Sequence, residues 1–351
     1  MDDETTLNQR SISRRTFIKA AGVGASALAL GSALVAAHES AEAATFYKGA
    51  DISWTPQMEA NGYIWKNASG VQEDLLTILK GYGINAIRLR TFVNPSSDPV
   101  NGHCSITETA AMAVRCKNAG LPVDIDFHFG DTWNSVGVQN PPAAWSGMSY
   151  SQMLNAMYNY VYHSCNVLKY NGVTPGWVQI GNEINSGICH PVGSISNPSQ
   201  MTGLLNAAYD MVKEVFPSTP VLIHLAQPQN SSSIENFFNA YQANGGKWDI
   251  SAFSSYGSGS STIAGIISNI NTYKSRYGKP VMQVEFGGRW DRASRTETDL
   301  ESYITGMKSI GGLGVFYWEP EVYSPFTSYN MGAWDPNTKE PTIAMNGFLN
   351  A

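Results

Sequence analysis

The segment "YNGVTPGWVQI", residues 170–180, decides the fold, because it contains the junction between a helix and a buried strand. Gly172 indicates the helix end, Pro175 a turn, and the β-branched residues that follow a strand. The same arrangement recurs in "KNAGLPVDIDF", residues 117–127, and "RYGKPVMQV", residues 276–284. A repeated helix–glycine–proline–strand junction predicts helices that alternate with parallel strands.

Eight short strands are predicted along the chain, each rich in Val, Ile or Phe and bounded by Gly, Pro, Asn or Asp. They span residues 48–53, 86–92, 122–129, 177–182, 221–226, 250–255, 280–286 and 314–318. Segments of helical periodicity separate them. This pattern predicts a single-domain α/β fold, a (β/α)8 TIM barrel over residues 44–351. An open doubly wound sheet is disfavoured because no G-x-G-x-x-G follows the first strand.

The N-terminus has the pattern of an export signal. Residues 13–19, "SRRTFIK", resemble a twin-arginine signal, a moderately apolar Ala/Gly-rich stretch follows, and "AEAA" offers a cleavage site after Ala43. A membrane anchor or a buried helix is the alternative reading. We expect residues 1–43 to be a signal peptide, and the mature protein to be secreted or periplasmic, folded before export and free of the membrane.

Composition excludes some partners. Only 14% of the 351 residues are charged, the net charge is -6, and aromatic residues reach 11%. The basic surface that nucleic-acid binding requires is missing, and many Trp and Tyr with few charges suit a polar, uncharged ligand. Four cysteines allow pairing of Cys104 with Cys189 and of Cys116 with Cys165, or four free buried thiols. Their spacing fits no zinc site.

Polar and aromatic residues stand at the ends of all eight predicted strands, where the active sites of such barrels lie. In chain order these are Asp51, Ser53, Arg88, Arg90, His128, Asp131, Trp133, Asn182, Glu183, His224, Tyr256, Glu285, Trp318 and Glu319. Two of them, Glu183 and Glu285, are strand-end carboxylates that point to the same mouth. A carboxylate pair about 5–5.5 Å apart is the machinery of a retaining glycosidase. Aromatic faces would hold a sugar ring, and no cofactor or metal is required.

Structural roles compete with several of these assignments. Arg88 and Asp126 lie on neighbouring strands and could form a buried ion pair inside the barrel. His128 and His224 could be core histidines, and Trp318 could be core packing. Glu319 rivals Glu285, but adjacent strand residues face opposite sides, so Glu319 is expected to face the helices if Trp318 faces the pocket.

Six segments together resemble glycoside hydrolase family 53, the arabinogalactan endo-β-1,4-galactanases. They are "YKGADISWTPQMEANG" (47–62), "INAIRLRTFVNP" (84–95), "DFHFGDTWNSVGVQNPPAAW" (126–145), "VQIGNEINSG" (178–187), "VMQVEFGG" (281–288) and "GVFYWEPE" (314–321). The likeness runs in order through essentially the whole mature chain. "DFHFGDTW" and "GNE", with "RLR" before them, are specific in combination.

The resemblance implies a role for each matching residue. Glu183 would be the acid/base and Glu285 the nucleophile. Arg88 would keep Glu285 ionised, Tyr256 would hydrogen-bond it, and Asn182 would bind the sugar 2-hydroxyl. The cleft would be lined by Asp51, His128, Asp131, Trp133, His224 and Trp318.

The sequence departs from the family in four substrate-side segments. The chain has Ala226 where the family has an aspartate, "SSYG" after the sixth strand, "ICHP" after "GNE", and "FGGRWD" after Glu285. We therefore expect a monomeric endo-glycosidase that cleaves a polysaccharide, β-1,4-galactan first. Another β-linked glycan such as mannan or β-glucan, and a non-catalytic carbohydrate-binding barrel, are the alternatives. Asp335 and Asn337 suggest calcium, but no ligand spacing supports a site.

Overall fold

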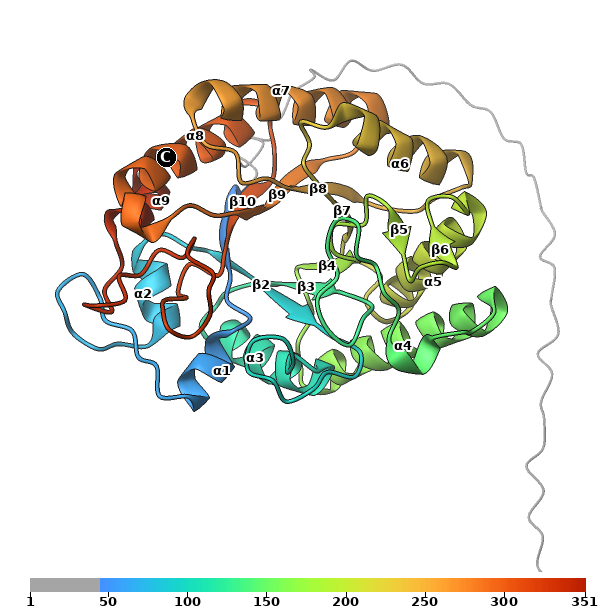
Figure 1. Cartoon of the computed structure of the whole chain (residues 1–351), viewed down its shortest axis with the longest axis horizontal. Helices are drawn as coiled ribbons and strands as arrows, with labels where there is room; N and C mark the ends of the chain where they lie inside the picture. Colours follow the sequence, from blue (N-terminus) through green and yellow to red (C-terminus); the bar gives the residue numbers. More distant parts are fainter. Residues whose placement is uncertain (1–44) are drawn as a thin grey trace, which may run out of the picture. The chain divides into compact units, whose positions relative to one another are not determined.

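Eight parallel strands close into a barrel in the order β1-β10-β9-β8-β7-β4-β3-β2, in a computed structural model that describes residues 45–351 (Figure 1). The strands are β1 (Tyr47–Asp51), β2 (Ala86–Thr91), β3 (Val123–Phe127), β4 (Trp177–Ile180), β7 (Val221–Ala226), β8 (Ile250–Ser254), β9 (Val281–Phe286) and β10 (Gly314–Trp318). The predicted (β/α)8 barrel is confirmed. The predicted signal peptide, residues 1–43, lies outside the described residues.

Helices alternate with the strands and surround them (Figure 1). A short antiparallel hairpin of β5 (Gly187–Ile188) and β6 (Gly193–Ser194) follows β4. The helices are α1 (Thr55–Ala60), α2 (Leu75–Gly81), α3 (Ile106–Asn118), α4 (Tyr150–Tyr170), α5 (Pro198–Val215), α6 (Ser231–Ala243), α7 (Ser260–Tyr277), α8 (Ala293–Ser309) and α9 (Gly347–Asn350).

Local sequence explains where the longer helices begin and end. Ser105 and Ser149 each form a capping box with the residue three positions later, which satisfies backbone donors at the starts of α3 and α4. Glycines with positive φ follow the helix ends, as at Gly172 (φ 70°) and Gly278 (φ 64°), where a side chain would be strained. The helix–glycine junctions expected from the sequence are therefore present.

The barrel interior changes from apolar to polar along the strands. One buried cluster contains Ala86, Trp177 and Leu222 together with Ile250, Ala252, Met282, Val284 and Phe316. Two residues further along β2, β4 and β7, the same faces carry Arg88, Gln179 and His224, all buried. A second, larger cluster packs the outer strand faces against the helices. The apolar layer thus supports a polar layer directly beneath the C-terminal mouth.

The described residues hold all four cysteines, and each is buried and unpaired. Neither predicted disulfide is formed, so the alternative of four free thiols describes the structure. No helix within residues 45–351 combines the length and the apolar character needed to cross a membrane.

The contact between Gly49 and Phe316 tests the packing of the barrel interior. A Cβ atom at Gly49 would lie 2.1 Å from Cδ1 of Phe316, its register partner on β10. We expect Gly49→Ala to lower the free energy of unfolding by about 1–3 kcal/mol through overpacking, measured by urea denaturation. Gly265→Ala is the matched control, because Gly265 lies within α7 with open space around it. There alanine should stabilise the helix by about 0.5–1 kcal/mol, and equal effects at the two sites would contradict this account.

Candidate active site

A cavity of about 310 Å³ opens at the C-terminal ends of the strands. It is lined by His128, Trp133, Asn134, Ser135, Asn182, Glu183, Tyr256, Glu285 and Trp318. These side chains come from five different strand ends or the loops after them, the usual construction of an active site on this fold.

Glu183 reaches the cavity because the chain leaves β4 through two left-handed residues. Gly181 has φ 101° and Glu183 itself has φ 50°, a conformation that is costly for a residue with a side chain. A Cβ at position 181 would lie 2.6 Å from Cγ2 of Ile184, so only glycine fits. Hydrogen bonds hold the turn, because the Gln139 amide donates to the carbonyls of Asn182 and Glu183.

Glu285 reaches the cavity from β9 through a β-bulge. The pairing register shifts by one residue between Gln283 and Glu285 against β8, and again against β10. Regular alternation would send Glu285 outward, since Val284 belongs to the interior cluster. The extra residue in β9 re-aims Glu285 to the inside, a known use of bulges beside active sites.

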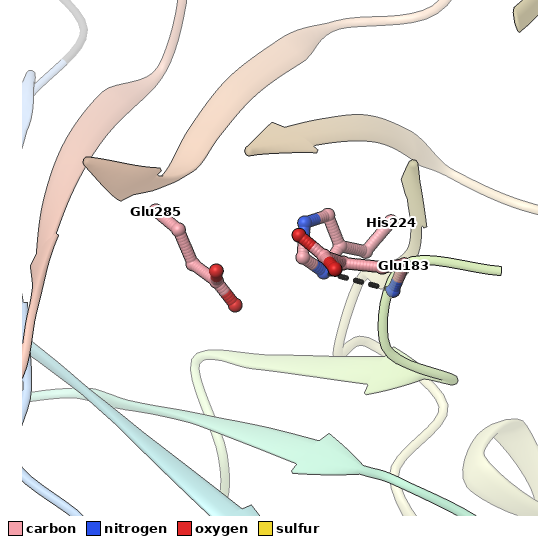
Figure 2. A group of neighbouring side chains, drawn as sticks. All are labelled: Glu183, His224 and Glu285. Atoms are coloured by element: carbon pink, nitrogen blue, oxygen red, sulfur yellow. Dashed lines mark hydrogen bonds between the residues drawn. The ribbon is translucent and has the colours of Figure 1, made fainter. Parts of the chain in front are cut away.

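The two glutamates face each other across the cavity, with His224 beside Glu183 (Figure 2). An oxygen of Glu183, an oxygen of Glu285 and a nitrogen of His224 all lie within 4.8 Å of one another. The hydroxyl of Ser254 donates to Oε1 of Glu183 at 2.7 Å, and the N–H of Val136 donates to Oε2 at 3.3 Å. The Tyr256 hydroxyl donates to Oε2 of Glu285 at 3.0 Å.

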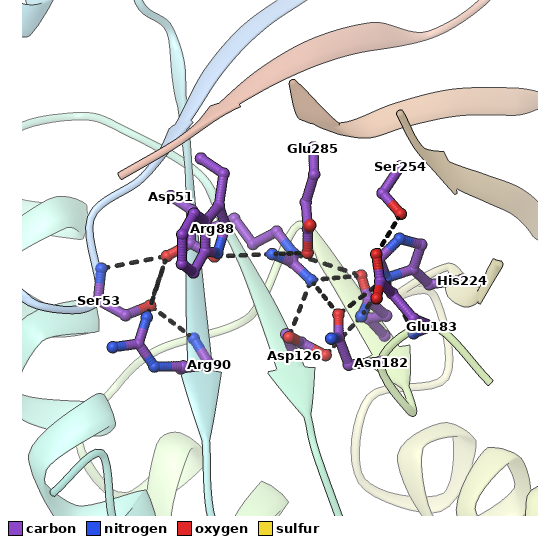
Figure 3. A network of polar contacts seen from close by, with 12 residues as sticks. Asp51, Ser53, Arg88, Arg90, Asp126, Asn182, Glu183, His224, Ser254 and Glu285 are labelled. Atoms are coloured by element: carbon purple, nitrogen blue, oxygen red, sulfur yellow. Dashed lines mark hydrogen bonds and ion pairs between the residues drawn. The ribbon is translucent and has the colours of Figure 1, made fainter. Parts of the chain in front are cut away.

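The guanidinium of Arg88 lies below Glu285 at the centre of a polar network (Figure 3). Its Nη1 contacts Oε1 of Glu285 at 2.9 Å and Oδ2 of Asp51 at 2.8 Å. Its Nη2 contacts Asp126 at 2.9 Å and donates to Oδ1 of Asn182 at 3.0 Å. Arg88 therefore has both of the roles considered from the sequence: it forms a buried ion pair with Asp126, and it also pairs with Glu285.

Burial and neighbouring charges shift the pKa values of this network in opposite directions. Burial disfavours the guanidinium, but Asp126, Glu285 and Asp51 outweigh it and raise the pKa of Arg88 above its ordinary value. Burial alone would raise the pKa of Asp126, but Arg88 and His128 outweigh it and lower this pKa to about 2. Asp124 lies farther from the guanidinium, with 4.0 Å between its Oδ2 and Nε of Arg88, and burial outweighs Arg88 and raises its pKa to about 7.

Burial raises the pKa of the Glu285 carboxyl to about 8, with Arg88 acting to lower it and the charge of Glu183 acting to raise it. The cation contacts Glu285 and not Glu183. Arg88 therefore favours the ionised form of Glu285 against the effect of burial.

The two histidines support the network in different ways. Nε2 of His128 contacts Asp126 at 2.9 Å, while Nδ1 accepts from the backbone of Asn134, so Nε2 carries the hydrogen. Burial and Arg88 lower the pKa of His224 well below its ordinary value, so its imidazole is neutral. Nδ1 of His224 contacts Asn182 and the N–H of Glu183.

The structure places most of the predicted site residues around one pocket. His128, Trp133, Asn182, Glu183, Tyr256, Glu285 and Trp318 line the glutamate cavity, and Asp51, Arg88 and His224 belong to the network beneath it. Asp131 does not line this cavity. Both of its carboxylate oxygens accept backbone N–H groups, from Asn94 and Ala143, so it fastens the loop.

Glu319 is excluded from the glutamate cavity, as expected, but it does not turn to the helices. Its fully buried carboxylate pairs with Arg90 and accepts the N–H of Trp54. Arg90 in turn stacks on Trp133, with 4.3 Å between its Cζ and the ring centroid. This pair therefore supports the aromatic wall of the cavity.

Four contributors were missed in the sequence: Ser254, Gln179, Asn134 and Ser135. Ser254 had a usable signal, because it lies two positions before Tyr256 and alternate strand residues share a face. Gln179 lies two positions after Trp177, which belongs to the interior cluster, so it shares the inward face of β4. Its amide donates to Asp126. Asn134 and Ser135 lie in an irregular loop, where no periodicity indicates direction.

One group of described residues has the composition of a metal site, namely Glu183, His224 and Glu285. The donor set is of the type that divalent metals use. However, Arg88 places a positive charge 2.9 Å from Glu285, and Tyr256 and Ser254 already donate to the carboxylates. The carboxylates are thus neutralised by protein donors, and the geometry fits acid/base chemistry better than metal binding.

The raised pKa of Glu285 predicts a pH-dependent stability. A carboxyl with an ordinary pKa of 4.5 and a folded-state pKa of about 8 binds more protons when folded, so it lowers the free energy of unfolding as pH rises between these values. Replacement by Gln removes this loss. We expect the stability of Glu285→Gln relative to the wild type to increase from pH 5 to pH 8, measured by urea denaturation. Glu214→Gln, on the exposed face of α5, is the control, and a difference that stays constant with pH would contradict the raised pKa.

Comparisons with known proteins agree with this geometry. Residues 47–303 match Glycosyl hydrolase family 53. The chain is 31% identical over 312 residues to a protein of Aspergillus fumigatus named probable arabinogalactan endo-beta-1,4-galactanase A, covering 81% of this chain and 86% of that protein. An Emericella nidulans protein named arabinogalactan endo-beta-1,4-galactanase A is also 31% identical, over 79% of this chain and 85% of its own length.

Solved structures give the same relationship. A family 53 catalytic domain from Ignisphaera aggregans superposes with a TM-score of 0.79 at 28% identity, covering 86% of this chain and 95% of that one. A structure from a study of two fungal beta-1,4-galactanases gives 0.80 at 26% identity, covering 87% and 99%. This chain therefore belongs to glycosyl hydrolase family 53 and is a glycoside hydrolase that acts on O-glycosyl bonds.

Proposed function

We propose that the protein is an exported, retaining endo-glycosidase that hydrolyses β-1,4-galactan by double displacement. The observation that carries the mechanism is the closeness of the two glutamates, since one oxygen of Glu183 lies within 4.8 Å of one oxygen of Glu285. Retaining enzymes need carboxyl groups about 5–5.5 Å apart, whereas inverting enzymes leave room for a water between them. The names of the relatives support galactan as the substrate.

In the first step Glu285 attacks the anomeric carbon and Glu183 protonates the departing oxygen. Arg88 forms an ion pair with Glu285 and the Tyr256 hydroxyl donates to it, so the carboxylate is held in place and its negative charge is stabilised. Burial and Glu285 raise the pKa of Tyr256 well above its ordinary value, so its phenol remains a hydrogen donor. Glu183 accepts hydrogen bonds only from uncharged donors, the Ser254 hydroxyl and the Val136 N–H.

In the second step Glu183 takes a proton from water, and the oxygen of that water displaces Glu285 from the sugar. Glu183 must therefore act once as an acid and once as a base. The Ser254 hydroxyl suits both states, because it donates to the carboxylate and can accept from the carboxylic acid. The side chain thus keeps its orientation through the cycle.

The aromatic residues around the glutamates suit a sugar ring. Trp133 and Trp318 line the cavity together, with ring centroids 6.0 Å apart, and Tyr256 closes it beside Glu285. The Tyr256 ring is 37% exposed although its hydroxyl points to Glu285, so part of its ring remains available to the substrate. Asn182, beside Glu183, is the expected ligand of the 2-hydroxyl.

The proposal predicts that linear β-1,4-galactan gives new reducing ends. NMR should show that the β-anomer of the product forms first. Glu183→Ala and Glu285→Ala should each lose about three or more orders of magnitude in turnover on galactan. Azide separates the roles on an aryl glycoside, whose phenolate leaves without protonation: it should rescue Glu183→Ala to a β-glycosyl azide and Glu285→Ala to an α-glycosyl azide. An initial α-product, or near-native activity of Glu285→Ala, would exclude the mechanism.

A panel of mannan, xylan, β-glucan and arabinogalactan tests the substrate separately from the mechanism. The alternative of another β-linked glycan has a specific basis in the loops. Ala226 puts a methyl group at a position where the family resemblance implies an aspartate, and its N–H is taken by Asn185. Activity on one of these glycans and none on galactan would identify that glycan as the substrate and leave the mechanism unchanged.

Export through the twin-arginine pathway is the last part of the proposal and rests on the "SRRTFIK" segment. Replacing Arg14 and Arg15 by Lys should retain the unprocessed protein in the cytoplasm, detected by cell fractionation and by the mass of the mature chain. The wild type should begin at Ala44. Unchanged export of the double variant would exclude this route.

A further inference from the structure

A second cavity, of about 650 Å³, adjoins the glutamate cavity, and Trp133 and Asn134 line both. Its walls come from the loop between β3 and α4, from the start of α4, and from residues 190–192 of the β5–β6 hairpin. It has about twice the volume of the 310 Å³ glutamate cavity. Its size therefore admits more than one sugar ring.

The walls of this second cavity flank Glu183. The Val136 N–H, in the loop between β3 and α4, donates to Glu183, and the hairpin begins at Gly187, four positions after Glu183. The two walls are joined, because the N–H of His190 donates to the carbonyl of Gln139 at 2.7 Å. None of the residues that line the cavity comes from β8, β9 or β10. The cavity thus lies on the acid/base side of the site, where the leaving oxygen departs.

The lining suits an uncharged ligand with hydroxyl groups and apolar faces. The amide of Asn140 and the hydroxyl of Ser146 make no hydrogen bond to other described residues, and His190 has Nδ1 free while Nε2 contacts Ser186. Apolar atoms come from Trp133, Pro141, Met148, Met153 and Val192. The lining contains no Lys or Arg, and the one carboxylate, Asp131, is taken up by backbone N–H groups. An anionic ligand would find no counter-charge there.

We propose that this cavity binds a neutral sugar residue of the departing part of the polysaccharide, either the chain itself or a branch on it. The inference rests on the proposed function and adds a subsite formed by Asn140 and His190. Continuity with the glutamate cavity through Trp133 and Asn134 supports a carbohydrate occupant. Binding a remote sugar during bond cleavage raises kcat/KM for substrates long enough to reach it.

The test compares two leaving groups on Asn140→Ala and His190→Ala. One substrate is the polysaccharide that the wild type degrades, and the other is an aryl glycoside of the oligosaccharide that the wild type releases. Losing one neutral hydrogen bond should lower kcat/KM on the polysaccharide about fivefold. The nitrophenyl leaving group carries no sugar hydroxyl groups to hydrogen-bond Asn140 or His190, so the effect on the aryl glycoside should stay below about twofold.

His163→Ala, on the exposed face of α4, is the matched control and should behave as the wild type on both substrates. Equal losses on both substrates would show a general disturbance of Glu183 and overturn the subsite, as would no loss on either. The activity of the wild type on galactan and on the panel of other glycans is measured first. Its outcome decides the substrate independently of whether the variants distinguish the two leaving groups.

Discussion

The guanidinium of Arg88 is the constraint on which the rest of the structure depends. A fully buried cation must be matched by buried acceptors, and those acceptors come from β1, β3, β9 and the end of β4. Removing one partner from such a group usually costs about 3–5 kcal/mol, because the other charge is left uncompensated. The network therefore binds strands that are distant in sequence and, through the same contacts, fixes the carboxylate of Glu285.

Local departures from regular geometry bring the reacting groups to this centre. Glu285 needs an extra residue in β9, and Glu183 needs a left-handed backbone after Gly181. Each departure is unfavourable alone. Both occur at strand ends, where the apolar layer below holds the strands and the hydrogen bonds of neighbouring loops hold the turn.

The sequence predicted the barrel because each strand is a short run rich in Val, Ile or Phe, and because three of the strands follow the same helix–glycine–proline junction. It also predicted both glutamates, since position at a strand end determines which face of a barrel a residue serves. The features that the sequence could not predict depend on backbone irregularities and on contacts between residues that are distant in the chain. Alternation alone would turn Glu285 outward after Val284, and only the bulge reverses this. Glu319 was excluded by alternation from the pocket, but its pairing with Arg90 depends on a contact between β10 and β2. Asp131 resembled a cleft residue, yet it serves the loop, because irregular backbone has no period that reveals direction.

The four buried, unpaired cysteines bear on when this molecule can finish folding. A barrel without disulfides needs no oxidant to reach its final packing, so it can be complete in a reducing compartment. Burial raises the pKa of each thiol, to about 11 for Cys104 and about 12 for the other three, which keeps the reactive thiolate scarce. The stability of this fold therefore does not depend on the redox environment, and it stays the same when the protein moves from a reducing to an oxidising compartment.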